Sequence, residues 1–196
     1  MRGTRRFSQA ISEGDGISLL VEVDGADAAR RAEDGGAEAL VVRRASGGVR
    51  DASVLPILWY AAGPLDEARR AGADAYLIVC ADHDLDELAE RHRAVLDAGL
   101  DCVVSVEEED ELAQVLEAVD PEIFLLSTPG DHQGADALER VLALLLDVPA
   151  GKLAIAEVAV SGRDQVDELE RAGVDAVLVG AADDVAGLAG RAPPEV

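Results

Sequence analysis

The fold is decided by a short motif that occurs four times, as GGAEAL (35–40), AGADAY (71–76), AGLDCV (98–103) and AGVDAV (172–177). Each copy follows a stretch rich in Ala, Leu, Glu and Arg and leads into a run of aliphatic residues. A glycine at the second position suits a helix that ends in the left-handed conformation, and the apolar run suits a buried strand. The motif therefore predicts repeated junctions from a helix to a buried parallel strand.

The same pattern extends along the whole chain. Strand-like runs lie at 17–23, 38–44, 54–60, 75–80, 101–106, 122–128, 152–158 and 175–180. Helical stretches lie near 26–34, 64–71, 84–98, 108–118, 134–146, 163–172 and 183–190, whereas 45–53 (ASGGVRDAS) is too short and glycine-rich for a full helix. Because parallel strands need crossovers of this length, we predict an α/β fold, a shortened (β/α)8 TIM barrel. Its helix between strands two and three is missing or vestigial, and an open doubly wound sheet is the alternative.

Length and composition indicate one globular domain. The 196 residues suit a single barrel over 1–196, with 1–16 as an N-terminal extension that holds a short helix. Hydrophobic residues make up 49%, yet no apolar run approaches the roughly 20 residues that cross a bilayer. The basic N-terminus becomes polar before a signal-peptide core develops, so we expect a cytoplasmic protein.

The charge of the chain restricts its partners. Forty acidic residues against 17 basic ones give a formal charge of −23, and Lys152 is the single lysine. Such a surface repels nucleic acid and anionic membranes, because binding either one requires Lys and Arg. Acid-rich, lysine-poor surfaces are typical of organisms with a salty cytoplasm, where salt screens self-repulsion. We expect neither a nucleic-acid nor a membrane partner, but a small-molecule ligand at the C-terminal face of the barrel.

No cofactor or metal motif stands out. The segment VDGADA (23–28) lacks the glycines of a dinucleotide fingerprint, so no cofactor is expected. Cys80, Asp82, His83 and Asp84 cluster after the fourth strand, and with His132 they could assist metal chemistry. Their spacing matches no established zinc pattern, however, and Asp82 or Asp84 is better interpreted as a helix cap. We therefore predict no metal site, and a metal-assisted enzyme is the weakest functional hypothesis.

The two cysteines lie in apolar runs. Cys80 and Cys102 are each followed or preceded by aliphatic strand residues. Buried, reduced thiols are the simplest interpretation, in preference to a disulfide or a nucleophile.

Four ordered stretches resemble the indole-3-glycerol phosphate synthase family, a (β/α)8 lyase of tryptophan biosynthesis. They are FSQAI…ISLLVEV (7–23), LPILWYAAGPLDEARRAGADAYLIVCA (55–81), VSVEEEDELAQVLEA (104–118) and IAEVAVSGRDQVDELERAGVDAVLVGAADD (155–184). The resemblance implies a ring closure of an anthranilate-bearing ribulose phosphate, with loss of carbon dioxide and water. That substrate is anionic, so the chemistry requires cations for the anions and carboxylates or other acids to move protons.

The residues that the family uses are only partly retained. Glu22 and Glu157 match the glutamates of strands one and seven, and Gly180 matches the glycine that ends strand eight. The two lysines that the family uses, after strands one and three, are replaced by Asp24 and Tyr60. The resemblance thus implies a carboxy-lyase, but whether this chain is an enzyme stays open at this point.

Other matched positions have also changed. Ser105 replaces the glutamate of strand five, Ser127 and Pro129 replace Asn and Arg after strand six, and Ala159 and Ala182 replace phosphate-holding residues. Ser105, Ser127 and Gly180 are candidate ligand-binding residues. Trp59 is a further one, because it could line an aromatic pocket with Tyr60, although core packing of at least one of them is the simpler interpretation.

The substitutions share one direction. Every cation expected from the family is gone, while Asp24, Asp183 and Asp184 add negative charge. We therefore predict a divergent barrel with an acidic site that does not run the ring closure and acts as a binding or regulatory protein. The alternative is an active carbon–carbon lyase that uses Glu22 and Glu157, with Tyr60 assisting. The unhelixed segment 45–53 leaves barrel wall exposed, which favours a homodimer contact there.

Overall fold

The computed structural model describes residues 7–13, 16–44, 47–60, 63–128, 135–180 and 184–189. Its strands form a closed barrel in sequence order, and each strand pairs in parallel with its neighbours, β1 with β8 included. The (β/α)8 prediction is confirmed, and the doubly wound alternative is wrong. The strands are β1 (Ser18–Glu22), β2 (Ala39–Val42), β3 (Ile57–Tyr60), β4 (Ala75–Val79), β5 (Asp101–Val106), β6 (Ile123–Leu126), β7 (Leu153–Glu157) and β8 (Ala176–Val179).

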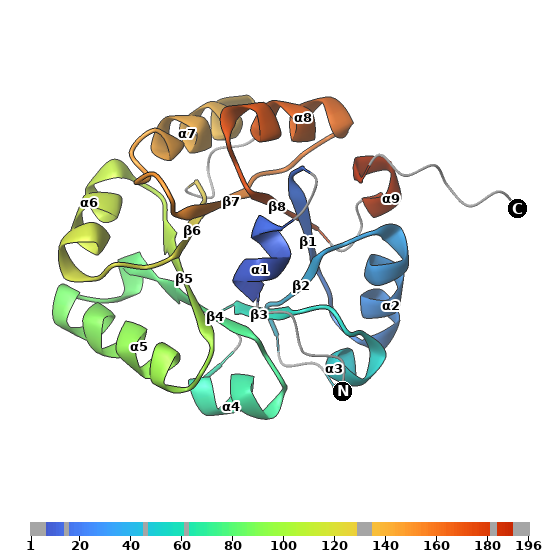
Figure 1. Cartoon of the computed structure of the whole chain (residues 1–196), viewed down its shortest axis with the longest axis horizontal. Coiled ribbons are helices and arrows are strands. Elements are labelled where there is room, and N and C mark those ends of the chain that lie inside the picture. Colours follow the sequence, from blue (N-terminus) through green and yellow to red (C-terminus); the bar gives the residue numbers. More distant parts are fainter. Residues whose placement is uncertain are drawn as a thin grey trace, which may run out of the picture.

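Helices surround the barrel as an outer ring (Figure 1). In the described part of the connection between β2 and β3, the helix is the four-residue α3 (Val49–Ala52), which confirms the prediction of a vestigial helix there. No described helix is long and apolar enough to cross a membrane. The other helices are α1 (Phe7–Ser12), α2 (Ala26–Gly35), α4 (Leu65–Arg70), α5 (Leu85–Asp97), α6 (Glu109–Ala118), α7 (Ala135–Leu145), α8 (Arg163–Ala172) and α9 (Val185–Leu188), with a 3-10 turn η1 (Cys80–Asp82) after β4.

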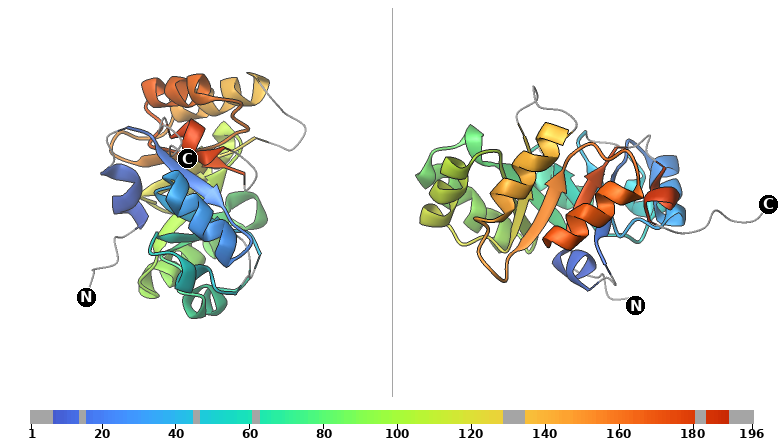
Figure 2. Two further views of the ribbon diagram at one scale, coloured as in Figure 1. Left: turned by 90° about the vertical axis from the view of Figure 1, so that its right-hand side faces the viewer. Right: turned by 90° about the horizontal axis from the view of Figure 1, so that it is seen from above.

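Strand alternation divides the core into two layers. Successive side chains of a strand point to opposite faces, so one set fills the barrel and the other packs beneath the helices. Leu20, Val41, Leu58 and Ile155 belong to the inner layer. Phe7 and Ile11 of α1 join that inner layer, and α1 lies across one end of the barrel (Figures 1 and 2). The short N-terminal helix therefore closes the end at which the strands begin.

The repeated motif works as predicted at its glycine. Gly36, Gly72, Gly99 and Gly173 all have φ between 75° and 100°, the left-handed conformation that ends a helix before the next strand. The acidic residue two positions later has a second role that the motif did not reveal. Its carboxylate accepts a hydrogen bond from a backbone N–H elsewhere at that end of the barrel, in the pairs Glu38–Leu19, Asp74–Ile57, Asp101–Ser8 and Asp175–Ala154.

Candidate functional site

The candidate site lies at the carboxyl ends of the strands, where (β/α)8 enzymes carry their chemistry. Extending the alternation of the inner layer by one step places a single residue, within or directly after each strand, at the barrel mouth. We call this set the mouth layer. It consists of Glu22, Arg43, Tyr60, Val79, Ser105, Ser127, Glu157 and Gly180.

Arg43 is the centre of the mouth layer. Its Nε donates to Glu22 Oε2 at 3.0 Å, and its Nη2 forms an ion pair with Glu157 Oε1. Tyr60 donates its hydroxyl proton to the second Glu157 oxygen at 2.9 Å. The guanidinium carbon of Arg43 also lies 3.8 Å from the centre of the Tyr60 ring, a cation–π geometry. Side chains from β1, β3 and β7 thus form one connected network with Arg43, the residue that directly follows β2.

The network determines the protonation states of Arg43 and Tyr60. Burial alone would lower the pKa of Arg43, but the charge of Glu157 and the contacts with Tyr60 and Glu157 raise it above its ordinary value. Burial, followed by the charge of Glu157, raises the pKa of Tyr60 to about 12 against the opposing effect of Arg43. Arg43 is therefore a permanent cation at neutral pH, and Tyr60 is a neutral hydrogen-bond donor.

The acidic site predicted from the sequence therefore also contains a cation that the prediction did not include. Arg43, which directly follows β2, places a positive charge between Glu22 and Glu157. The signal was present in the sequence. In EALVVRR (38–44) the inward positions are Ala39, Val41 and then Arg43, so alternation from the strand core assigns Arg43 to the mouth.

Trp59 does not share the mouth with Tyr60. It is 2% exposed and belongs to the outer core layer, on the face of β3 that lies beneath the helices. Adjacent strand residues must face opposite ways, so Tyr60 at the mouth requires Trp59 on the wall. Ser105 and Ser127 are 3% and 6% exposed at the mouth, whereas Asp24 is exposed.

The acidic rim extends beyond the mouth layer. Glu107 follows β5, and burial together with the charges of Glu111, Glu157 and Glu108 raises its pKa. At the end of β8, the Asp184 carboxylate accepts a hydrogen bond from the backbone N–H of Gly187 at 3.2 Å and so caps α9. In many barrels the helix start near this point receives a phosphate, so in this chain a carboxylate takes up a donor that a phosphate could use.

The suspected metal cluster is a helix start. Asp84 caps α5 by accepting from the backbone N–H of Glu87 at 2.9 Å, as the simpler interpretation predicted. His83 Nδ1 lies 3.6 Å from a Glu87 oxygen. Among the described residues no group of three or more His, Cys, Asp or Glu side chains could hold a metal ion. Cys80 and Cys102 are buried free thiols, whereas Pro129, His132, Ala182 and Asp183 lie outside the described residues.

These features define a (β/α)8 barrel with a carboxylate–guanidinium–phenol cluster at the carboxyl ends of its strands. The family model of indole-3-glycerol phosphate synthase matches residues 62–183, which is more than half of the chain. The chain belongs to the indole-3-glycerol phosphate synthase family, which confirms the resemblance seen in the sequence.

Named relatives agree with this assignment. Indole-3-glycerol phosphate synthases from a Geobacillus species and from Salinibacter ruber are 30% and 33% identical to this chain over 116 residues, or 59% of its length. That match covers 45% and 43% of the two relatives, so it spans less than half of their length. Both matches therefore leave a large part of this chain and of the relatives unaligned.

Solved structures show the same fold at low identity. An N-acetylmannosamine-6-phosphate 2-epimerase from Clostridium perfringens has a TM-score of 0.67 at 14% identity and covers 84% of this chain and 86% of its own. A tryptophan synthase α-subunit variant from Pyrococcus furiosus has a TM-score of 0.67 at 17% identity and covers 88% and 98%. At these identities the likeness establishes the (β/α)8 fold alone.

Proposed function

We propose that this chain is a divergent barrel of the family that binds a small molecule at its mouth and does not catalyse the ring-closing decarboxylation. One observation carries the proposal. Arg43 forms ion pairs with both retained glutamates, so the two carboxylates that the family would use for proton transfer are engaged by a cation from the barrel itself.

The residue at the third-strand lysine position supports the same conclusion. Tyr60 stands there, and its hydroxyl is already donated to Glu157. Its pKa of about 12 keeps it neutral at physiological pH, so it supplies no positive charge for a substrate carboxylate or for charge that develops in the reaction. A proton donor with so high a pKa is also a weak general acid near pH 7.

The start of α9, where a phosphate would be expected to bind, supports the same proposal. Asp184 occupies the donor of Gly187 at the start of α9, and a second anion near this carboxylate would be repelled. Glu107 adds further negative charge at the rim. A phosphorylated substrate therefore meets an acidic rim instead of a phosphate cradle.

The alternative is an active carbon–carbon lyase that uses Glu22 and Glu157 as acid and base, with Tyr60 assisting. The observation that favours it is Arg43, because a partly buried cation beside two carboxylates could hold a substrate anion if one ion pair opened. In that case Arg43 would exchange a glutamate for the substrate carboxylate.

The deciding experiment incubates the purified protein with the anthranilate-bearing ribulose phosphate and measures the fluorescent indole product after chromatographic separation. We expect no product above the level of a matched Glu157→Gln variant. Turnover that the Glu157→Gln substitution abolishes would establish the lyase. A parallel calorimetric titration with inorganic phosphate should show no binding to the unaltered protein, and saturable binding would contradict the acidic-rim argument.

A further inference from the structure

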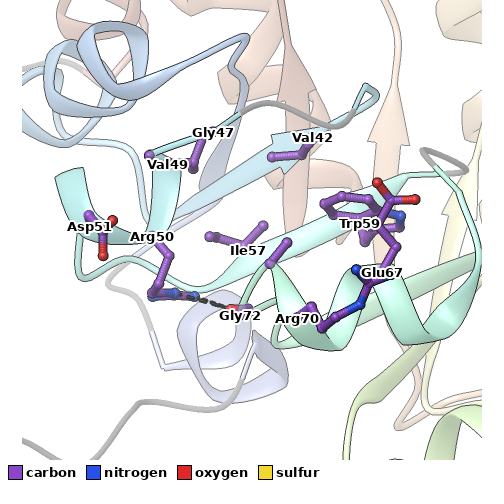
Figure 3. Close-up of a pocket in the computed structure, with 12 residues that line it drawn as sticks. Val42, Gly47, Val49, Arg50, Asp51, Ile57, Trp59, Glu67, Arg70 and Gly72 are labelled. Carbon is purple, nitrogen blue, oxygen red and sulfur yellow. Dashed lines mark hydrogen bonds between the residues drawn. The ribbon is translucent and has the colours of Figure 1, made fainter.

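A second concave site lies on the barrel wall, away from the mouth. Because α3 is only four residues long, the outer face of β2 and β3 between α2 and α4 is not covered by a full helix. A hollow of about 510 Å³ occupies this place, and we call it the wall pocket (Figure 3). Its volume falls in the range of about 300–1,000 Å³ that is typical of small-molecule sites.

The floor of the wall pocket is apolar. It consists of Val42, Ile57 and Trp59, which all belong to the outer core layer. Water binds poorly to such a floor, because the floor offers few hydrogen-bond partners and a confined water molecule loses hydrogen bonds to other water molecules. A flat apolar molecule would instead exchange hydrated surface for contact with aliphatic side chains and an indole ring.

The floor holds one unsatisfied donor. Among the described residues, Nε1 of Trp59 is the buried side-chain nitrogen or oxygen that has no hydrogen-bond partner. An unpaired buried N–H is costly, and native structures usually provide an acceptor for it. The flexible side chains of Glu67 and Arg70 on α4 lie on the same side of the pocket as Trp59 (Figure 3), so they can move to admit an acceptor.

Hydrogen bonds hold the opposite rim in place, and the charges of the whole pocket lining balance. Arg50 donates to the carbonyl oxygens of Gly72 and Leu55 and forms an ion pair with Asp74, which fixes its guanidinium in place. The pocket lining contains two arginines, Arg50 and Arg70, and two carboxylates, Asp51 and Glu67. With these charges in balance, and with a chain charge of −23 that repels anions, the pocket favours a neutral ligand.

We propose that the wall pocket binds a neutral, flat, mostly apolar small molecule whose single hydrogen-bond acceptor pairs with the indole N–H of Trp59. The site uses the space left by the shortened helix and is independent of the chemistry at the mouth.

The chain provides a direct readout, because Trp59 is its single tryptophan. An ¹H–¹⁵N spectrum therefore contains one indole N–H signal. The probes are 1-indanone and indane, which share a bicyclic apolar skeleton but differ in the carbonyl acceptor. We expect 1-indanone to move the indole signal saturably and to bind about 2- to 10-fold more tightly than indane, the advantage of one net hydrogen bond.

Two alanines give a matched pair of variants. Ala71 lines the wall pocket at the end of α4 with φ −76° and ψ −5°, and Ala98 occupies the same place at the end of α5 with φ −75° and ψ −7°. Ala71→Leu fills the pocket and should weaken both probes at least about 5-fold, since it removes part of their contact surface. Ala98→Leu, which lies outside the pocket, should leave both affinities unchanged.

Trp59→Phe tests the hydrogen bond to the ligand separately from the apolar contact with the floor. This variant keeps an aromatic floor and removes the donor, so saturation-transfer signals of the probes should report equal affinities for indane and 1-indanone. The proposal is overturned if neither probe moves the indole signal, if the unaltered protein does not prefer 1-indanone, or if Ala71→Leu binds as well as Ala98→Leu. An indole signal that shifts on dilution of the protein alone would assign the face to a second copy of the chain and would equally overturn it.

Discussion

Removing Arg43 tests the central network of the mouth. Arg43→Met replaces the arginine with an unbranched apolar side chain. It leaves Glu22 and Glu157 without their cation and removes the cation–π contact with Tyr60. Glu157→Gln removes the negative charge that faces Arg43 while retaining a hydrogen-bond acceptor for Tyr60. The two substitutions and their combination form a double-mutant cycle.

The structure sets the size of the expected effect. Two opposite charges 3 Å apart attract by about 5 kcal/mol at an effective dielectric constant of about 20, before the cost of desolvation. The side chains of Arg43 and Glu157 are 29% and 24% exposed, so the pair lies between a surface ion pair and a fully buried one. Surface pairs contribute up to about 1 kcal/mol, and breaking a buried pair costs about 3–5 kcal/mol. We therefore expect Arg43→Met to lower the free energy of unfolding by about 2 kcal/mol, with a coupling to Glu157 of at least about 1 kcal/mol.

Urea unfolding at pH 7 provides the measurement. Trp59 is 2% exposed on the barrel wall, so its fluorescence reports unfolding without contact with the substituted residues. Arg44→Met is the control, because Arg44 is exposed next to Arg43 and should change the stability by less than about 0.5 kcal/mol. Additive effects of Arg43→Met and Glu157→Gln, within about 0.5 kcal/mol, would refute the network as described.

Three further predictions concern single groups. The pKa of Tyr60 is raised to about 12 in the folded protein, so the stability that its protonated form contributes is complete below a pH of about 10 and is lost as the pH rises towards 12. Tyr60→Phe should therefore reduce the fall of the urea midpoint between these pH values. A urea midpoint that falls equally steeply with pH in the variant contradicts this. Burial and, to a smaller extent, the charge of Asp101 raise the pKa of Cys102 to about 12, and burial and then Glu111 raise the pKa of Cys80. A thiol reagent at pH 8 should therefore label neither cysteine until urea unfolds the chain. Rapid labelling of the native protein argues against this. Gly72 and Gly99 have φ of 75° and 79°, but of these two only a Cβ at position 72 would meet Arg50 Cγ, at 3.1 Å. In urea unfolding, Gly99→Ala should lower the free energy of unfolding by about 1 kcal/mol, and Gly72→Ala should lower it by about 1 kcal/mol more. Equal losses of stability exclude a role for the Arg50 contact.

The fold was predictable because its signals are local. A glycine that ends a helix and an apolar run that begins a strand lie within six residues, and their repetition implies parallel pairing. The role of Glu38, Asp74, Asp101 and Asp175 was not predictable in the same way. Each of these carboxylates bonds a backbone N–H that is 17 to 93 residues away, and only the strand register brings the partners together.

The candidate site was predicted in part. Matching single residues to the family found Glu22, Glu157 and Tyr60, which the structure brings into one network. Arg43 was not predicted, because the resemblance to the family indicates no cation after strand two. Trp59 was predicted to line a pocket together with Tyr60, whereas neighbouring strand residues face opposite sides of the wall.

The Arg43 network at the mouth and the packing that holds the barrel together belong to different layers of side chains. The family match begins at residue 62, so Glu22, Arg43 and Tyr60 precede it, whereas their partner Glu157 lies within it. Beneath these side chains, the inner layer remains aliphatic and continuous around the barrel. Because that apolar layer supplies the packing and hydrogen-bonded strands close the ring, the side chains of the mouth contribute little to closure. The same separation predicts that Arg43→Met lowers stability without opening the barrel, so its native circular dichroism should match that of the unaltered protein.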